Sequence, residues 1–171
     1  MNKSEFNSTW SALHGGAEIK GIVKTWLAIS YSSAKLLSKL HVTPNLLTLL
    51  GVLFAVAMAA NPLSLWAIPR LVLSLYADGI DGSVAIYQKR QSSFGAILDA
   101  SADRISEALW FYVAYRIGAP AWLVLGIYVI ASTQEYARAR LTSLGISGVG
   151  VVTPAERPVR ASFIFIALVS Y

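Results

Sequence analysis

Two pairs of aspartates constrain the fold of this chain more than any other feature. Asp78 and Asp81 are three residues apart, and Asp99 and Asp103 are four apart, so each pair shares one face if its segment is helical. The polar stretch 88–93 between the pairs is typical of a turn that folds the second helix back on the first. The sequence therefore predicts two packed helices that bring four of the nine acidic residues into one small volume.

Four carboxylates in such a volume need cations, because like charges at low dielectric cannot all stay ionised. Aspartate oxygens suit Mg²⁺, Mn²⁺ or Ca²⁺, and four carboxylates can hold two divalent ions roughly 3.5–4 Å apart, the arrangement that clamps phosphoryl groups. Gly82, Ala85 and Gly95 are small, which lets a ligand approach the helix backbone. We therefore predict a two-metal phosphate site. The alternative interpretation is a solvated acidic face with incidental spacing.

The composition favours a membrane protein. Of 171 residues, 56% are hydrophobic and only 13% are charged, which is too apolar for an ordinary soluble domain. The absence of cysteine excludes a disulfide framework and a thiolate metal site. Although the net charge is +5, the basic residues are not interleaved with aromatics on one polar face, so we expect no nucleic-acid partner. We expect an all-α integral membrane protein, a polytopic bundle of transmembrane helices.

The N-terminal part differs in pattern from the rest. Residues 1–17 lack the charge and apolar pattern of a cleaved signal peptide. Over 19–40 apolar residues recur at helical spacing while lysines occupy other faces, which predicts an amphipathic helix lying in the membrane interface; a first, poor span is the alternative. We therefore expect a tail and juxtamembrane helix over 1–42 and a transmembrane domain over 43–171.

Apolar runs separated by proline or glycine turns follow. Each is long enough, with its flanking residues, to approach the roughly twenty residues that a bilayer requires. The predicted spans are 46–60, 63–88, 94–117 and 121–144, with a fifth that begins at 162. Because the sequence stops inside this fifth run, we expect a fragment or a truncated form.

The basic residues predict an orientation. If the amphipathic helix is cytoplasmic, alternation of the spans places only Arg70 and Arg116 at depth or on the opposite side. The positive-inside rule supports this assignment. We therefore expect a multi-pass protein of the cell membrane whose carboxylate site faces the cytoplasm. Carboxylates within a membrane are costly and are by default functional.

The aspartate stretch resembles the signature of the CDP-alcohol phosphotransferases, D-x2-D-G-x2-A-R-x8-G-x3-D-x3-D. The chain matches this motif from Asp78 to Asp103 at every fixed position except one, since Ile86 stands where the family has arginine. The resemblance implies a membrane phospholipid synthase with the family's six-helix bundle, which forms a homodimer. It also implies a polar cavity that opens to the cytoplasm.

A second group of residues narrows the resemblance. The segment 136–140, the glycine-rich loop after it and the segment 156–160 resemble the actinobacterial phosphatidylinositol phosphate synthases within the family, and 43–48 resembles the family's entry to its first span. Arginine forks suit phosphate, so we expect several of the arginines to hold a phosphorylated acceptor. Anchoring under the positive-inside rule is the alternative role. The arginines are Arg138, Arg140, Arg157 and Arg160.

The resemblance also implies roles for the site residues. The donor would be CDP-diacylglycerol, with its diphosphate bridging two Mg²⁺ or Mn²⁺ ions. Asp103 would act as the general base on the acceptor hydroxyl, inositol phosphate being the favoured acceptor and glycerol phosphate the second choice, with release of CMP. The metal ligands implied are Asp78, Asp81, Asp99 and Asp103; donor contacts are expected from Asn45, Asp81, Gly82, Ala85 and Gly95.

Two functions of other classes stay open at this point. A cation transporter would place its carboxylates near the bilayer midplane with polar residues continuing across the membrane, whereas the spans here are apolar beyond the cluster. A non-catalytic member of the family, retained as a dimer partner, is suggested by Ile86. The substitution Ile86→Arg would separate a weakened enzyme from such a member.

Overall fold

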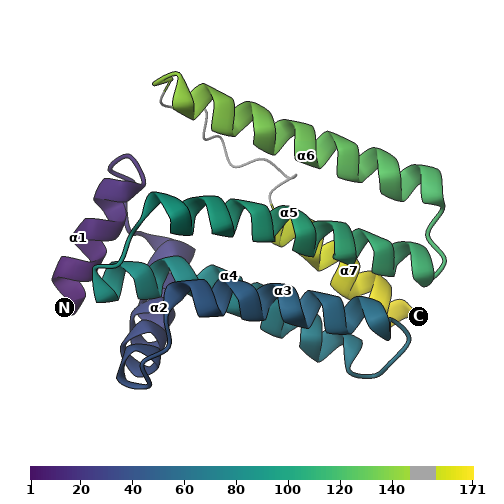
Figure 1. Ribbon diagram of the computed structural model, residues 1–171, viewed down its shortest axis with the longest axis horizontal. Coiled ribbons are helices and arrows are strands. Elements are labelled where there is room, and N and C mark those ends of the chain that lie inside the picture. The colour runs from purple at the N-terminus through teal and green to yellow at the C-terminus, as the bar shows by residue number, and fades with distance from the viewer. Residues whose placement is uncertain (147–156) are drawn as a thin grey trace. The chain divides into compact units, whose positions relative to one another are not determined.

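The computed structural model describes residues 1–146 and 157–171, and within these ranges the chain forms helices and no strand (Figure 1). The helices are α1 (Lys3–Leu13), α2 (Gly21–Lys39), α3 (Pro44–Ala60), α4 (Ala67–Gln88), α5 (Ser93–Arg116), α6 (Ala121–Ser143) and α7 (Arg157–Ser170). The all-α prediction is confirmed. Most of the glycine-rich loop, together with Glu156, lies outside the described residues.

Local sequence signals explain several of the helix ends. The Asn2 side chain caps α1 by accepting a hydrogen bond from the Glu5 backbone N–H at 2.8 Å. Helix α3 starts with proline, and the Thr43 hydroxyl accepts from the Leu46 N–H at 3.3 Å. Directly after the C-terminal end of α4, Lys89 has a left-handed φ of 55°, the backbone conformation that ends many helices. The break predicted within 88–93 therefore lies between α4 and α5.

The described chain divides into two compact units. The first comprises residues 1–51 and 76–102, and the second comprises residues 52–75 and 103–171. Helices α3, α4 and α5 each contribute residues to both units. The predicted boundary between residues 42 and 43 stays a prediction.

Two buried apolar clusters stabilise the first unit. One joins Ala34 of α2 to Leu47 of α3 and to Ile80 and Val84 of α4. The other, which we call the Phe6 cluster, contains Phe6 of α1, Leu27 of α2 and Ile86 of α4. Because burial of apolar surface is the main favourable term in folding, the Phe6 cluster contributes to holding the N-terminal helix on this unit.

A larger cluster forms the core of the second unit. It includes Met58, Leu71, Trp110, Val113 and Ile164, which come from α3, α4, α5 and α7. The apolar runs that predicted helices in this part of the chain thus supply its buried side chains. This packing fixes α7 beside the part of α5 that follows Asp103.

Among the described residues, no single helix combines the length and the apolar character that a membrane crossing requires. Helices α2 and α3 meet that requirement only as a pair, with a bend of 107° between them. The polytopic arrangement stays a prediction.

Candidate active site

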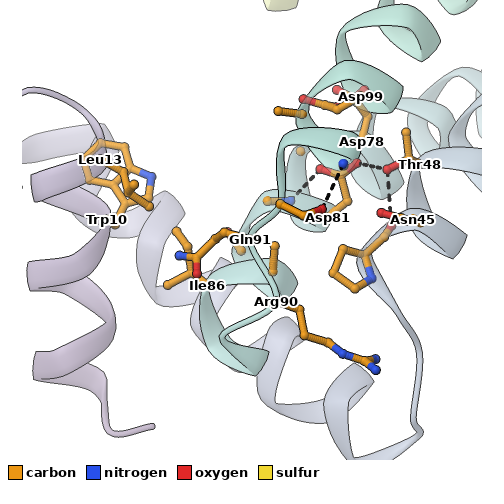
Figure 2. A pocket seen from close by; sticks show the side chains of 18 of the residues that line it. Trp10, Leu13, Asn45, Thr48, Asp78, Asp81, Ile86, Arg90, Gln91 and Asp99 are labelled. Carbon is orange, nitrogen blue, oxygen red and sulfur yellow. Dashed lines mark hydrogen bonds between the residues drawn. The ribbon is translucent and has the colours of Figure 1, made fainter.

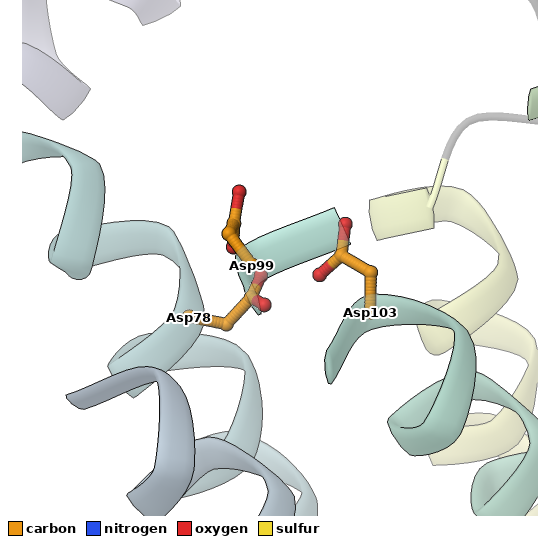
Figure 3. Close-up of side chains that lie close together, drawn as sticks. All are labelled: Asp78, Asp99 and Asp103. Carbon is orange, nitrogen blue, oxygen red and sulfur yellow. The ribbon is translucent and has the colours of Figure 1, made fainter. Parts of the chain in front are cut away.

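Asp78 of α4 and Asp99 of α5 meet within the first unit (Figure 3). Each offers a carboxylate oxygen, and these oxygens lie within 4.8 Å of one another. Both side chains are half-buried. The turn between α4 and α5 is what allows residues from the two aspartate pairs to approach, as the sequence predicted.

Asp103 lies one helical turn beyond Asp99 on α5. In the second unit Asp103 forms an ion pair with Arg157 of α7. The Arg104 guanidinium approaches its other oxygen at 4.0 Å. Asp103 therefore belongs to a helix face shared with Asp99 and is neutralised by neighbouring arginine.

Asp81 shares α4 with Asp78, but its carboxylate is directed to α3 (Figure 2). It is buried and accepts hydrogen bonds from the Thr48 hydroxyl and from the Gly82 backbone N–H. Sequence reasoning assigned no role to Thr48, although it lies one turn after Pro44 and Asn45. The role of Asp81 as a metal ligand stays a prediction, and Thr48 is the side chain that orients it.

A pocket of about 430 Å³ lies within the first unit (Figure 2). This volume falls in the range of roughly 300–1,000 Å³ that is typical of small-molecule sites. Asp78, Asp81 and Asp99 line it. So do all of the small or polar residues for which donor contacts were predicted, namely Asn45, Gly82, Ala85 and Gly95.

The glycines in the pocket differ in what surrounds them. A Cβ at Gly82 would meet no atom within 4 Å, so this glycine leaves open space beside Asp81. A Cβ at Gly95 would lie 3.1 Å from the Ser92 hydroxyl and 3.4 Å from the Asn45 amide oxygen. Gly95 thus permits close approach of α5 to the start of α3.

The pocket also has an aromatic wall that the sequence did not reveal. Trp10 and His14 of the N-terminal segment line it, as does Trp26 of α2. The rings of Trp10 and His14 are stacked, with centroids 4.0 Å apart. This wall could not be predicted from local patterns, because nothing in residues 1–17 indicates that they contact residues near position 80.

The four predicted phosphate-binding arginines all lie in the second unit. Arg157 pairs with Asp103, and its guanidinium also lies over the Trp110 ring, 4.9 Å from the centroid. Arg160 pairs with buried Glu107 and lies 3.6 Å from Glu135. On α6, Arg138 is half-buried and Arg140 is exposed. A role in binding an acceptor phosphate stays a prediction for all four.

Glu107 is the centre of a buried charge network in the second unit. Its side chain is fully buried, pairs with Arg160 and receives Arg104 at 3.1 Å. The spacing along α5 places it on the same face as Asp103, but the sequence did not indicate its arginine partner on α7. This network ties α7 to α5 and fixes the helix that carries Arg157.

Residues 41–171 match the CDP-alcohol phosphatidyltransferase family. The chain belongs to this family. The prediction from the aspartate motif is thereby confirmed, and the chain is an enzyme of the phosphatidyl-transferring type. Of the functions left open by the sequence, the family supports this one over a cation transporter.

Several curated relatives of the chain are synthases of inositol phosphate lipids. The archaetidylinositol phosphate synthase of Aeropyrum pernix is 33% identical over 138 residues, which cover 77% of this chain and 70% of the relative. The phosphatidylinositol phosphate synthase of Cutibacterium acnes is 33% identical over 144 residues, with the same coverage. That of Corynebacterium glutamicum is 37% identical over 139 residues, covering 74% of this chain and 63% of the relative.

The position at which the CDP-alcohol phosphatidyltransferase motif has arginine is occupied here by buried Ile86. Ile86 lines the pocket and belongs to the Phe6 cluster. Of the two basic residues that follow, Arg90 is exposed and lines the pocket. Lys89 instead pairs with Glu5 at 3.1 Å, and the hydrogen bond from its ammonium lowers the pKa of the Glu5 carboxyl. Arg90 is therefore the nearby cation that faces the site.

The clustered carboxylates fit the divalent ions that members of this family generally use. Asp78 and Asp99 present hard oxygen ligands within 4.8 Å of each other, and Asp103 continues this set along α5. Two carboxylates so close repel each other unless a cation lies between them. The residues present thus fit Mg²⁺ or Mn²⁺ by the chemistry of their donor atoms.

Proposed function

We propose that this chain transfers a phosphatidyl group from CDP-diacylglycerol to a hydroxyl of inositol phosphate and releases CMP. The meeting of Asp78 and Asp99 at the wall of a pocket, within the family motif, is the observation that carries the proposal. Inositol phosphate is favoured as acceptor because the names of the three relatives above share it, whereas their lipid parts differ. Glycerol phosphate is the second candidate.

The aspartates have the following roles in this proposal. Asp78, Asp81, Asp99 and Asp103 would hold two Mg²⁺ or Mn²⁺ ions, and the bound ions would supply positive charge toward the donor diphosphate and the leaving CMP. Asp103 takes the proton of the acceptor hydroxyl as its oxygen attacks the phosphorus on the diacylglycerol side. The bond between that phosphorus and the oxygen of CMP breaks. Thr48 holds the Asp81 carboxylate in orientation.

In this proposal the pocket residues bind the donor and the arginines bind the acceptor. Asn45, Gly82, Ala85 and Gly95 line the pocket and contact the cytidine nucleotide of the donor. The phosphate of the acceptor is bound by arginines of α6 and α7, Arg138, Arg140, Arg157 and Arg160. Since Arg157 already pairs with Asp103, it is the arginine best suited to bring an acceptor phosphate to the general base.

A CMP-release assay tests the reaction. The purified chain in detergent receives CDP-diacylglycerol, Mg²⁺ or Mn²⁺ and one acceptor: inositol phosphate, glycerol phosphate or free inositol. We expect metal-dependent release with inositol phosphate, lost in Asp103→Asn and kept in Glu18→Gln, an exposed carboxylate paired with Lys20. CMP release with glycerol phosphate alone would mean that glycerol phosphate, and not inositol phosphate, is the acceptor. No release with any acceptor would contradict the proposal.

We further propose that the chain is a multi-pass membrane protein, a homodimer, with its site facing the cytoplasm. Because the chain has no cysteine, single-cysteine variants can map its orientation in intact cells with a membrane-impermeant maleimide. Asn61→Cys, between α3 and α4, should be labelled from outside, whereas Leu144→Cys, after α6, should be labelled only in lysed cells. Equal labelling of both would contradict this arrangement. Light scattering in detergent measures the oligomeric state, which we expect to be a dimer.

A further inference from the structure

The pocket of the first unit has two chemically different walls (Figure 2). The acidic wall, with Asp78, Asp81 and Asp99, suits cations and phosphate. The aromatic side chains that also line the pocket, Trp10 and Trp26, have no role in that chemistry. A ligand that fits both walls carries an anionic group at one end and a flat apolar or aromatic group at the other.

Trp26 is held directly against the backbone of α4. A Cβ at Gly79 would lie 3.0 Å from Cζ2 and 3.3 Å from Cη2 of the Trp26 ring, so any larger residue would require the indole to move by a few tenths of an ångström. The family motif leaves this position free, since it is the first of the two variable residues between Asp78 and Asp81. The contact with Trp26 therefore explains the glycine at position 79, which directly follows the predicted metal ligand Asp78.

The indole of Trp26 is 38% exposed although it is packed on Gly79. Its open surface lines the pocket, where Trp10, itself half-buried in contact with the Phe6 cluster, lines the same cavity. Aromatic side chains in a positioned wall are the usual stacking surface for nucleobases. The neighbouring Arg90 contributes a cation to the same pocket.

We propose that Trp26, seated on Gly79, binds the base of the cytidine nucleotide donor, with Trp10 as the second aromatic residue of this subsite. This inference rests on the proposed function. It assigns α1 and α2, which lie outside the aspartate motif, a direct part in donor binding. The alternative for an indole on α2 is an anchor at the membrane interface, which would leave nucleotide affinity unchanged.

Binding of two soluble probes separates base recognition from phosphate recognition. Affinities for CDP and for inorganic pyrophosphate are measured with Mn²⁺ by calorimetry on the full chain in detergent. Trp26→Ala should weaken CDP binding by roughly 5- to 100-fold, the range expected for loss of one stacked base, and leave pyrophosphate binding unchanged. Trp26→Phe should recover most of the CDP affinity. Trp122→Ala, an exposed tryptophan of α6, is the matched control.

Gly79→Ala provides a second, independent variant. Its Cβ should push the Trp26 ring by a few tenths of an ångström, so CDP affinity should fall modestly in the wild-type background but not further in the Trp26→Ala background. Unchanged CDP affinity in Trp26→Ala, or an equal loss for pyrophosphate, would overturn the inference while leaving the proposed function intact. A wild-type chain that binds neither probe would overturn both.

Discussion

Ile86 and Phe6 belong to the same buried apolar cluster, although they lie on helices far apart in the sequence. Ile86 is 4% exposed and Phe6 is fully buried. Together with Leu27 they join α1, α2 and α4 at the position where the family motif has a charged residue. The departure from the motif is thus coupled to the docking of the N-terminal helix.

Ile86→Arg should therefore destabilise the chain. An arginine at this position would replace the apolar contacts with Phe6 and Leu27 by a charged side chain, and we expect a loss of about 2–4 kcal/mol with release of α1. Thermal unfolding in detergent and protease cleavage within Lys3–Leu13 measure the two effects. Ile86→Val, which keeps the apolar contact, should cost only about 0.5–1.5 kcal/mol. If Ile86→Arg kept the stability and raised CMP release, the motif arginine would fit after all.

Thr48→Val should impair the site without unfolding the chain. It preserves the shape of the side chain but removes the hydroxyl that donates to buried Asp81, and an unsatisfied buried acceptor costs about 1–3 kcal/mol. We expect CMP release to fall roughly tenfold or more. Thr48→Ser should retain most activity, and Thr25→Val, at an exposed position on α2, should have no effect. Full activity of Thr48→Val would mean that Asp81 needs no orienting donor.

Glu107→Gln should lower stability by about 3–5 kcal/mol, because the buried Arg160 guanidinium loses its buried carboxylate partner and keeps only Glu135, at 3.6 Å. The double variant Glu107→Gln/Arg160→Gln should recover part of this loss, since both buried charges are removed. Denaturation in detergent checks both variants. The control Glu18→Gln breaks an exposed pair with Lys20, which is worth only about 0–1 kcal/mol. An equal loss of stability in Glu107→Gln and Glu18→Gln would contradict a stabilising role for the buried charge network.

Removal of divalent ions with EDTA should abolish CMP release. Mg²⁺ or Mn²⁺ should restore it, because the clustered ligands are hard carboxylate oxygens, with neither sulfur nor imidazole among them. Bound Mn²⁺ can be counted by electron paramagnetic resonance independently of activity. Asp99→Asn should lose bound Mn²⁺ relative to Glu18→Gln. Retention of activity in EDTA would show that the carboxylates serve another purpose.

Local patterns allowed much of the fold and the site to be predicted. Helical spacing placed Asp99 and Asp103 on one face of α5, and the polar stretch after Gln88 placed a turn between α4 and α5. These are properties of neighbouring residues, which the periodicity of a helix determines. The motif itself indicated the family, which the match over residues 41–171 confirms.

Contacts between distant residues could not be predicted in this way. The sequence by itself determined the helices, the acidic cluster and the family, because each depends on spacing within a short segment. Only the tertiary structure decided that Trp26 packs on Gly79, that Thr48 orients Asp81 and that Glu107 binds Arg160. Such pairs are fixed by how helices pack, and packing depends on the shapes of both surfaces together, which no single segment specifies.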